Sequence, residues 1–381
     1  MNPDTPPMKL PVLLTTLSLA AAPLWAANNA ETLIQTLASV GREGDGNEQA
    51  SAAWKAAVAL GPNALGAVLS QTGTGNPVAD NWLRLAGNTI VDHALKSGKP
   101  LPFGELESFV KKTANNEAAR MLAFDLLQQS DSVRAETLQR TLVNDPVQPL
   151  RRGAVAHLIT AAAALQGDAA KKAYLGALEV VRDEDQTKTV SDALNKLGSP
   201  VQLQQHFGFL AKWHVIGPFD NTDRSGFEKV YPPEKEIDLT KSYDGKEKQV
   251  QWQPFESKDD YGKLDFNKPL TALKQSTAYA HTTFESATER EAELRLGCKN
   301  AWKVWLNGKL LFARDEYHRG QRMDQYKLKC HLRKGRNEIL VKCCQNEQTE
   351  SWTVEWEFQL RVCDSGGTAI LPAKLDPNAS R

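Results

Sequence analysis

The sequence predicts a multidomain α + β protein, in which an N-terminal α-helical repeat region is followed by an antiparallel β-sandwich or jelly roll. Three observations support this prediction. Between residues 28 and 200, apolar residues recur every three or four positions, which is the period of an amphipathic helix. Between residues 212 and 364, short strand-like runs are separated by Gly, Asn and Asp turns. Among these runs, Asn307-Gly308 joins two apolar segments and is a pair favoured in type I′ hairpin turns.

The first 27 residues have the pattern of a signal peptide. Lys9 precedes an apolar run over residues 10–24, and the small residues Ala26 and Ala27 follow, so we expect cleavage after one of these two alanines. The run is short for a bilayer crossing, although an uncleaved anchor stays open as an alternative. We therefore expect an exported protein, periplasmic or extracellular, with no integral membrane association after cleavage.

The charge balance and the missing motifs exclude several classes of function. Lys plus Arg and Asp plus Glu are both 46, which gives no basic excess for a nucleic-acid partner. The sequence has no Walker loop, HExxH, GxSxG or GxGxxG motif. We therefore predict that the protein is not an enzyme and uses no cofactor.

The helical region repeats a local pattern, in which a small residue follows an arginine by three positions. The pairs are Arg84 with Gly87, Arg120 with Ala123, and Arg151 with Ala154. Their spacing is typical of short helical-hairpin repeats. We expect the small residue to let neighbouring helices approach, and the arginine to reach a helix end or a carboxylate. Residues 145–156, DPVQPLRRGAVA, resemble HEAT-like repeats, which implies a docking surface for a protein. An irregular helical bundle stays open as the alternative.

Strand alternation assigns faces in the second half. The last strand places Trp352, Trp356 and Val362 on a face toward the core and the intervening polar residues toward water. Trp213 is likewise expected in the core. The predicted limits are 1–27 for the signal peptide, 28–200 for the helical region, 201–211 for a linker, 212–364 for the β-sandwich and 365–381 for a flexible tail.

The five cysteines all lie in the β half, at positions 298, 330, 343, 344 and 363. Alternation places Cys330 and Cys343 on apolar strand faces, and the adjacent Cys344 points to the opposite side from Cys343. Two interpretations stay open: small buried hydrophobes, or one or two disulfides in an exported protein. No CxxC pair exists, so we predict no metal site.

Several segments of the β half resemble the galactose-binding-like jelly-roll modules of exported bacterial proteins. They are WHVIGPFDN (213–221), YPPE (231–234), ELRLGCKNAWKVWLNGKLLF (293–312) and LRKGRNEILVK (332–342). In style they are similar to the sugar-binding domain of family 2 glycoside hydrolases. With the signal peptide and helical repeats, the whole is similar to exported proteins of planctomycete-type bacteria. Where many relatives have an acidic turn, this chain has Cys298, Lys299, Asn300 and Ala301, so the resemblance does not imply calcium there.

The resemblance directs attention to residues on and after the hairpin that suit a sugar. A sugar site combines a flat aromatic ring with planar polar groups, and we predict ligand contacts from Trp305, Asn307, Arg314, Tyr317 and Arg319. Alternation places Trp302 inward and Trp305 outward. The alternative is that a neighbouring loop buries Trp305 against the sandwich.

The carboxylates near these residues do not predict catalysis. Asp315, Glu316 and Asp324 lie in the same stretch, but nothing in the sequence fixes the separation that glycoside hydrolysis requires. The hypothesis is therefore a non-catalytic exported binding or scaffold protein, whose β-sandwich contacts carbohydrate or a cell-envelope component and whose helices contact a protein. The alternatives are a purely structural or protein-interaction module without a sugar site, or an accessory part of a carbohydrate-active enzyme.

Overall fold

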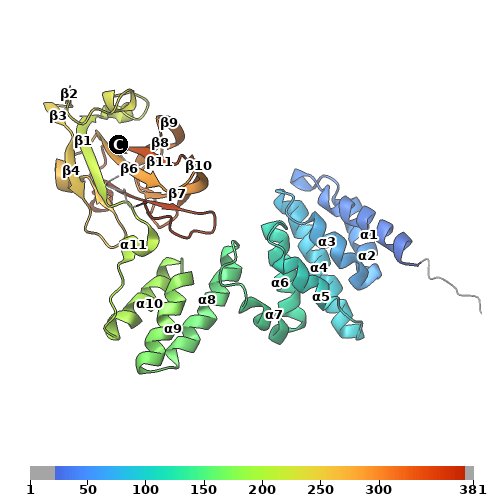
Figure 1. Ribbon diagram of the computed structural model, residues 1–381. Helices are drawn as coiled ribbons and strands as arrows, with labels where there is room; N and C mark the ends of the chain where they lie inside the picture. The colour runs from blue at the N-terminus through green and yellow to red at the C-terminus, as the bar shows by residue number, and fades with distance from the viewer. Residues whose placement is uncertain (1–21, 374–381) are drawn as a thin grey trace, which may run out of the picture. The chain divides into compact units, whose positions relative to one another are not determined.

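A computed structural model describes residues 22–373 of the chain, with side chains described from residue 29 onward. Its contacts divide the chain into two compact units, Met1–Thr141 and Leu142–Arg381. The first unit is helical, and the second contains helices followed by antiparallel strands (Figure 1). The prediction of a mixed α + β protein is thereby confirmed. Most of the predicted signal peptide, residues 1–21, lies outside the described residues, as do residues 374–381 of the predicted tail.

The helices of the first unit pack against one another both as sequence neighbours and across intervening helices. A Cβ on Gly87 of α4 would meet Leu126 of α6 at 3.3 Å, so the glycine allows these two helices to approach closely, as predicted. Arg120 is buried, and its Nε donates to Val110 O at 2.7 Å, near the end of α5. This is the predicted use of the repeat arginine. The helices are α1 (Ala22–Ala38), α2 (Asn47–Leu60), α3 (Leu65–Gln71), α4 (Pro77–Ser97), α5 (Phe103–Lys111), α6 (Glu117–Ser130) and α7 (Ser132–Gln139), with short 3₁₀ turns η1 (Arg42–Gly44) and η2 (Gly61–Ala64).

One continuous helical run in this unit, Asn47–Gln71, is long and apolar enough to cross a membrane by length and composition alone. The sequence analysis did not predict such a run. It consists of α2, η2 and α3, and Ala50, Ala53 and Ala57 of α2 are buried within the unit. A core helix of a soluble protein meets the same two criteria, so the run carries no membrane assignment.

The second unit begins with helices that the sequence analysis placed with the preceding ones in a domain over 28–200. They are α8 (Gln148–Ala163), α9 (Gly167–Val180), α10 (Glu184–Lys196) and α11 (Leu203–Phe207). Contacts group them with the strands, and α11 occupies part of the predicted linker 201–211. The domain limits 28–200 and 212–364 stay predictions.

We call residues 212–373 the β module. Its strands form a six-stranded antiparallel sheet in the order β4-β1-β6-β11-β8-β9, a four-stranded one in the order β10-β7-β12-β5, and the pair β2-β3. The strands are β1 (Lys212–Asp220), β2 (Ser242–Asp244), β3 (Gln249–Gln251), β4 (Gln253–Glu256), β5 (Leu264–Asp265), β6 (Ser276–Ser286), β7 (Arg290–Cys298), β8 (Ala301–Leu306), β9 (Lys309–Arg314), β10 (Tyr326–Leu332), β11 (Gly335–Gln345) and β12 (Glu357–Cys363), with the short helix α12 (Asn267–Leu270) after β5.

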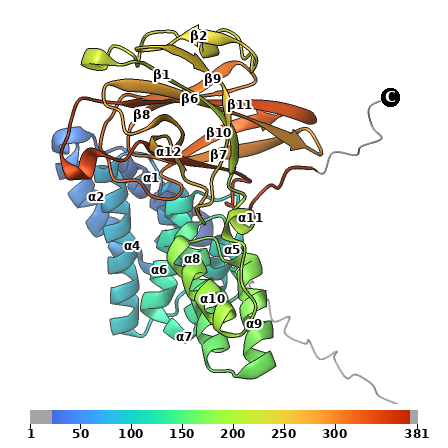
Figure 2. The same cartoon turned by 90° about the vertical axis from the view of Figure 1, so that its left-hand side faces the viewer.

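The main core of the β module lies between the two larger sheets, where Trp213, Trp302 and Trp356 are buried as predicted. A second apolar cluster lies on the other face of the six-stranded sheet, under the segment that contains β2 and β3 (Figure 2). β8 and β9 form the predicted hairpin, and both turn residues have positive φ, 52° at Asn307 and 78° at Gly308. Because a type I′ turn requires that conformation, the local sequence determines this feature.

The prediction for the last strand is wrong in two respects. β12 begins only at Glu357, and Trp352 lies earlier, in the 3₁₀ turn η5 (Ser351–Thr353), with 57% of its surface exposed. The second face of β12 is not open to water either, since Gln359 and Arg361 are buried. Residues after the strand help to cover that face. Ile370 N donates to Val362 O at 2.9 Å, so the start of the predicted flexible tail is held to the module.

All five cysteines are free and buried. Cys330 and Cys343 lie in the main core and Cys344 in a separate cluster, as the alternation predicted. The Sγ atoms of Cys298 and Cys343 lie 3.8 Å apart without a bond. These thiols are thus used as small buried hydrophobic groups rather than as disulfides.

Candidate functional site

Trp305, the central residue of the predicted sugar site, is 9% exposed. It does lie on the outer face of the six-stranded sheet, as alternation predicted. There it packs in the second apolar cluster with Trp252 and Leu340. Since its ring is covered by the module itself, the prediction that Trp305 is exposed to ligand is wrong.

Asn307 is committed to the hairpin turn. Its Oδ1 accepts from Glu338 N at 2.9 Å, and its Nδ2 donates to Asn337 Oδ1 at 3.0 Å. Both polar atoms of the amide therefore hold β8 and β9 against β11. The side chain has structural partners where the sequence analysis expected a ligand.

The other three predicted residues lie close together in sequence, with Arg314 as the last residue of β9 and Tyr317 and Arg319 on the segment that follows. Arg314 Nε and Arg319 Nε lie 3.7 and 3.5 Å from the same carboxylate oxygen of Glu316. Tyr317 is half-buried beside them, and its hydroxyl accepts from Asn221 Nδ2 at 3.2 Å. These residues form a polar surface at which the side chain of Arg319 is 67% exposed.

The carboxylates of this stretch differ in their surroundings. Asp315 is exposed, Glu316 is shared by two arginines, and Asp324 is ion-paired with the buried Arg295 and Arg361. Burial alone would raise the pKa of Asp324, but the hydrogen bonds and charges of Arg361 and Arg295 outweigh it and hold that pKa below its ordinary value. A general acid for glycoside hydrolysis needs a raised pKa instead. Asp324 is therefore unsuited to that role.

The sequence analysis missed Trp352, which it assigned to the core. The indole packs edge-on against His318, with ring centroids 5.4 Å apart, and His318 Nε2 is 2.7 Å from Asn346 Oδ1. The polar run 345–351, QNEQTES, was the available signal, because a loop of that composition should have ended the alternation before Trp352.

The loop that carries Trp352 is firmly anchored. The buried Thr353 donates through Oγ1 to Gln348 O and Glu350 O at 2.9 and 2.8 Å. Its carbonyl accepts from Gln345 Nε2 at 3.1 Å and from Lys274 Nζ at 2.8 Å. Trp352 is thus an exposed aromatic ring on a backbone that is already ordered, which reduces the entropy lost when a ligand binds.

A chain of contacts extends from Trp352 across neighbouring side chains. His318 is 6.2 Å from the ring of Tyr317, Arg224 lies 5.2 Å over that ring, and Arg224 Nη2 donates to Glu347 Oε1 at 2.5 Å. We call these five residues, Arg224, Tyr317, His318, Glu347 and Trp352, the Trp352 surface. It combines apolar ring faces with planar polar groups.

A buried network fixes the segment next to this surface. Lys342 is fully buried, and its Nζ donates to Phe227 O, Lys229 O and Glu234 Oε1 at 3.0, 2.8 and 2.8 Å. Tyr279 donates its hydroxyl to the same Glu234 oxygen. Burial lowers the pKa of Lys342, although the hydrogen bond to Glu234 opposes that shift. The network pins residues 227–234 to the outer face of the six-stranded sheet.

Comparison with models of protein families gave no match, and comparison with curated proteins gave none either. Among solved structures, the chain is similar to an anti-sigma factor domain-containing protein from Clostridium clariflavum, at 14% identity and a TM-score of 0.25, over 42% of this chain and 45% of that one. It is also similar to Faecalibacterium prausnitzii β-glucuronidase, at 13% identity and a TM-score of 0.22, over 41% of this chain and 31% of that one. A third similar structure is the β-glucosidase of Kluyveromyces marxianus, at 10% identity and a TM-score of 0.27, over 74% of this chain and 35% of that one. The chain spans less than half the length of each, and such TM-scores assign neither fold nor function.

Proposed function

We propose that the chain is a non-catalytic exported binding protein whose β module contacts carbohydrate through the Trp352 surface. The proposal includes the finer fold interpretation, in which the β module is a galactose-binding-like jelly roll and the helices are HEAT-like repeats that dock a protein. The observation that carries it is Trp352, a large aromatic side chain that is 57% exposed on an anchored loop. Tryptophan is enriched at contact surfaces, because its ring is apolar and its N–H is polar.

The contacts around Trp352 suit a sugar ring. One face of the indole is available to the C–H groups of a pyranose. Arg224 and Glu347 lie on the same surface and offer donors and acceptors for hydroxyl groups. The side chains of these two residues are 48% and 46% exposed, so a ligand reaches them without displacing buried structure.

The expected contribution of Trp352 follows from its exposed area. A tryptophan side chain carries roughly 200 Å² of surface, of which about half is exposed here, and one stacked sugar covers about half of that. At about 25 cal/mol per Å², this corresponds to about 1.4 kcal/mol, or a tenfold change in Kd. We therefore expect Trp352→Ala to weaken glycan binding about tenfold.

The test is a glycan array with the full chain, followed by titration of each glycan that binds. Val354→Ala is the matched control, because Val354 is 50% exposed two residues away but offers no ring. We expect that control to bind within about twofold of the unaltered protein. A folded protein that binds no glycan contradicts the proposal and favours the alternative of a structural or protein-interaction module. Hydrolysis of chromogenic glycosides that is lost in Glu316→Gln would overturn the non-catalytic part.

A further inference from the structure

An arginine-rich cavity of about 690 Å³ lies within the second unit, away from the Trp352 surface. The first turn of α8, the connection from α9 to α10, β7 and the segment before β10 line it. Its charged lining residues comprise six basic and four acidic side chains: Arg151, Arg152, Arg182, Arg295, Arg322 and Lys327 with Asp183, Glu184, Asp185 and Asp324. A cavity of this size matches the sites that proteins use for small organic ligands.

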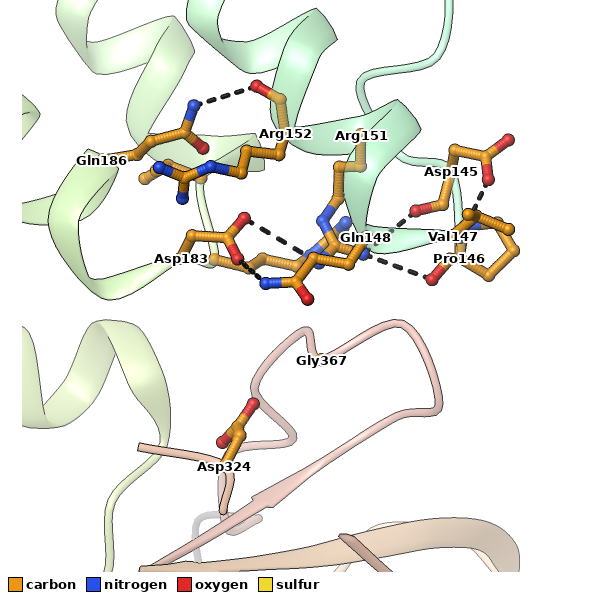
Figure 3. Close-up of polar contacts among 12 residues, drawn as sticks. Asp145, Pro146, Val147, Gln148, Arg151, Arg152, Asp183, Gln186, Asp324 and Gly367 are labelled. Atoms are coloured by element: carbon orange, nitrogen blue, oxygen red, sulfur yellow. Dashed lines mark hydrogen bonds and ion pairs between the residues drawn. The ribbon is translucent and has the colours of Figure 1, made fainter. Parts of the chain in front are cut away.

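Arg151 is 6% exposed and only partly paired. Its Nη1 donates to Asp145 O at 3.0 Å, and its Nη2 lies 3.9 Å from Asp183 Oδ2, beyond hydrogen-bond distance (Figure 3). Its Nε is buried and has no hydrogen-bond partner. Asp183 is also engaged by Gln148, whose Nε2 donates to Oδ1. The carboxylate of Asp183 is therefore shared, and the Arg151 guanidinium keeps a donor without a partner.

Arg182 has more guanidinium nitrogens without a hydrogen-bond acceptor than Arg151 has. Its Nη2 donates to Asn144 Oδ1 at 2.8 Å, whereas its Nε and Nη1 are buried and have no hydrogen-bond partner. Burial lowers the pKa of Arg182; the charge of Asp364 opposes this effect, and the charges of Arg295 and Arg361 add to it. Buried charged donors normally have partners, since leaving them unpaired is costly. Arg151 and Arg182 thus both line the cavity, and both carry buried guanidinium nitrogens that lack an acceptor.

Two helix N-termini reinforce this positive potential. α8 begins at Gln148 and α10 at Glu184, and both first turns line the cavity. Neither N-cap residue, Val147 or Asp183, makes a side-chain hydrogen bond to its helix. A helix N-terminus carries partial positive charge, which favours an oxyanion. At the start of α10 the Asp185 carboxylate already accepts backbone hydrogen bonds from Asp185 and Gln186, so α8 contributes more of this potential.

Two of the four other basic residues that line the cavity are neutralised by ion pairs. Arg152 Nη1 donates to Asp185 Oδ1 at 2.7 Å, and Arg295 is ion-paired with Glu293 and Asp324. Glu184 is exposed and lies at the start of α10. The cavity therefore offers unsatisfied donors from Arg151 and Arg182 next to carboxylates that accept from hydroxyl groups.

We propose that this cavity binds a small polyhydroxylated molecule that bears an oxyanion, with the anion held by Arg151 and Arg182 and the hydroxyl groups by the neighbouring carboxylates. Carboxylate, sulfate and phosphate share the geometry that a guanidinium fork recognises. The cavity is several times larger than an inorganic oxyanion, so the anion is part of a larger molecule. This site is separate from the Trp352 surface, and its occupancy does not depend on that surface.

Calorimetric titration of the full chain tests the proposal with five probes at constant ionic strength: glucuronate, glucose 6-sulfate, glucose 6-phosphate, inorganic phosphate and glucose. We expect saturable binding of at least one acidic sugar and none of glucose. Arg182→Gln should weaken that binding about tenfold or more, since it removes charge-assisted hydrogen bonds. Trp352→Ala should leave it unchanged, which separates this proposal from the preceding one.

Arg336→Gln is the matched control, because the side chain of Arg336 is 61% exposed, is ion-paired with Glu338 and does not line the cavity. Thermal unfolding without ligand provides a second measurement. Removing an unpaired buried charge in Arg182→Gln should leave the melting temperature equal or higher, whereas the bound sugar should raise it in the unaltered protein. Inorganic phosphate that binds as tightly as glucose 6-phosphate would overturn the sugar assignment. If Arg182→Gln binds the acidic sugar as tightly as the unaltered protein, or if no acidic probe binds saturably, the proposed site is wrong.

Discussion

Replacing Asp324 by asparagine tests how the β module neutralises the two arginines on the outer face of its four-stranded sheet. Arg295 and Arg361 face each other across β7 and β12 and are 5% and 1% exposed. Asp324 accepts from Arg361 Nε and Nη2 at 2.7 and 2.6 Å and from Arg295 Nη1 at 2.7 Å. One carboxylate thereby compensates two buried cations.

The loss of unfolding free energy in Asp324→Asn depends on the hydrogen-bond partners that each arginine retains. Breaking a buried ion pair by removing one partner costs about 3–5 kcal/mol. Arg295 retains Glu293 at 2.8 Å, and Arg361 retains the carbonyls of Phe207 and Gly367 at 3.1 Å. We therefore expect the lower end of the range, about 3 kcal/mol of unfolding free energy. For a unit of this size that is about 6–12 °C in Tm.

The effect should depend on pH in a defined direction. The pKa of Asp324 is lowered in the folded protein, whereas an unfolded aspartate has a pKa of about 3.9. The stabilisation is therefore complete above the unfolded pKa and is lost as the pH falls through the folded pKa. The stability difference between the unaltered protein and Asp324→Asn should be constant from about pH 8 to pH 5 and shrink below about pH 4.

Denaturant unfolding followed by circular dichroism measures this difference at each pH. Asp315→Asn is the control, because it makes the same chemical change at an exposed position nearby and should alter stability by about 0.5 kcal/mol or less. A loss below about 1 kcal/mol for Asp324→Asn, or a difference that grows as the pH falls, would refute the electrostatic reasoning.

Two further predictions concern buried groups of the β module. Lys342→Met should destabilise the protein by about 3 kcal/mol in denaturant unfolding, because Glu234 and two backbone carbonyls lose their shared donor; an unchanged midpoint would contradict this. The five thiols should react with a thiol reagent only after unfolding, because all are buried and burial raises the pKa of Cys330 and Cys363 to about 11 and of Cys344 to about 12. Rapid reaction of one thiol in the native protein would show that a strand opens locally.

Local sequence was sufficient to predict the structure wherever one or two residues determine the backbone conformation or the buried side. Asn307-Gly308 specified its turn because few other residues adopt positive φ twice in succession. Alternation likewise gave the correct inward side for Trp302, Cys330 and Cys343. Gly87 was correctly assigned to a close helix approach, since a small residue on an apolar helix face has little other purpose.

The candidate site could not be predicted, because alternation identifies a side of a strand but not what covers that side. Trp305 lies on the predicted side, yet residues 231–252 bury it. Arg361 was expected in water, yet Phe207 and Gly367 supply carbonyls over it from segments before and after the sheet. Arg151 and Arg182 share no sequence motif, and only the packing of α8 against α9 brings them to one cavity.

Hydrogen-bond satisfaction distinguishes buried charges that support the fold from those available to a ligand. Lys342 is fully buried and has acceptors for all three of its protons, so a ligand would have to displace existing partners. Arg361 similarly uses Nε, Nη1 and Nη2. Arg151 is buried and Arg182 is half-buried, but between them three buried guanidinium nitrogens have no acceptor. An oxyanion that reaches these nitrogens would satisfy donors that the fold leaves unpaired, and this difference, rather than charge or burial alone, favours the arginine-rich cavity as a binding site.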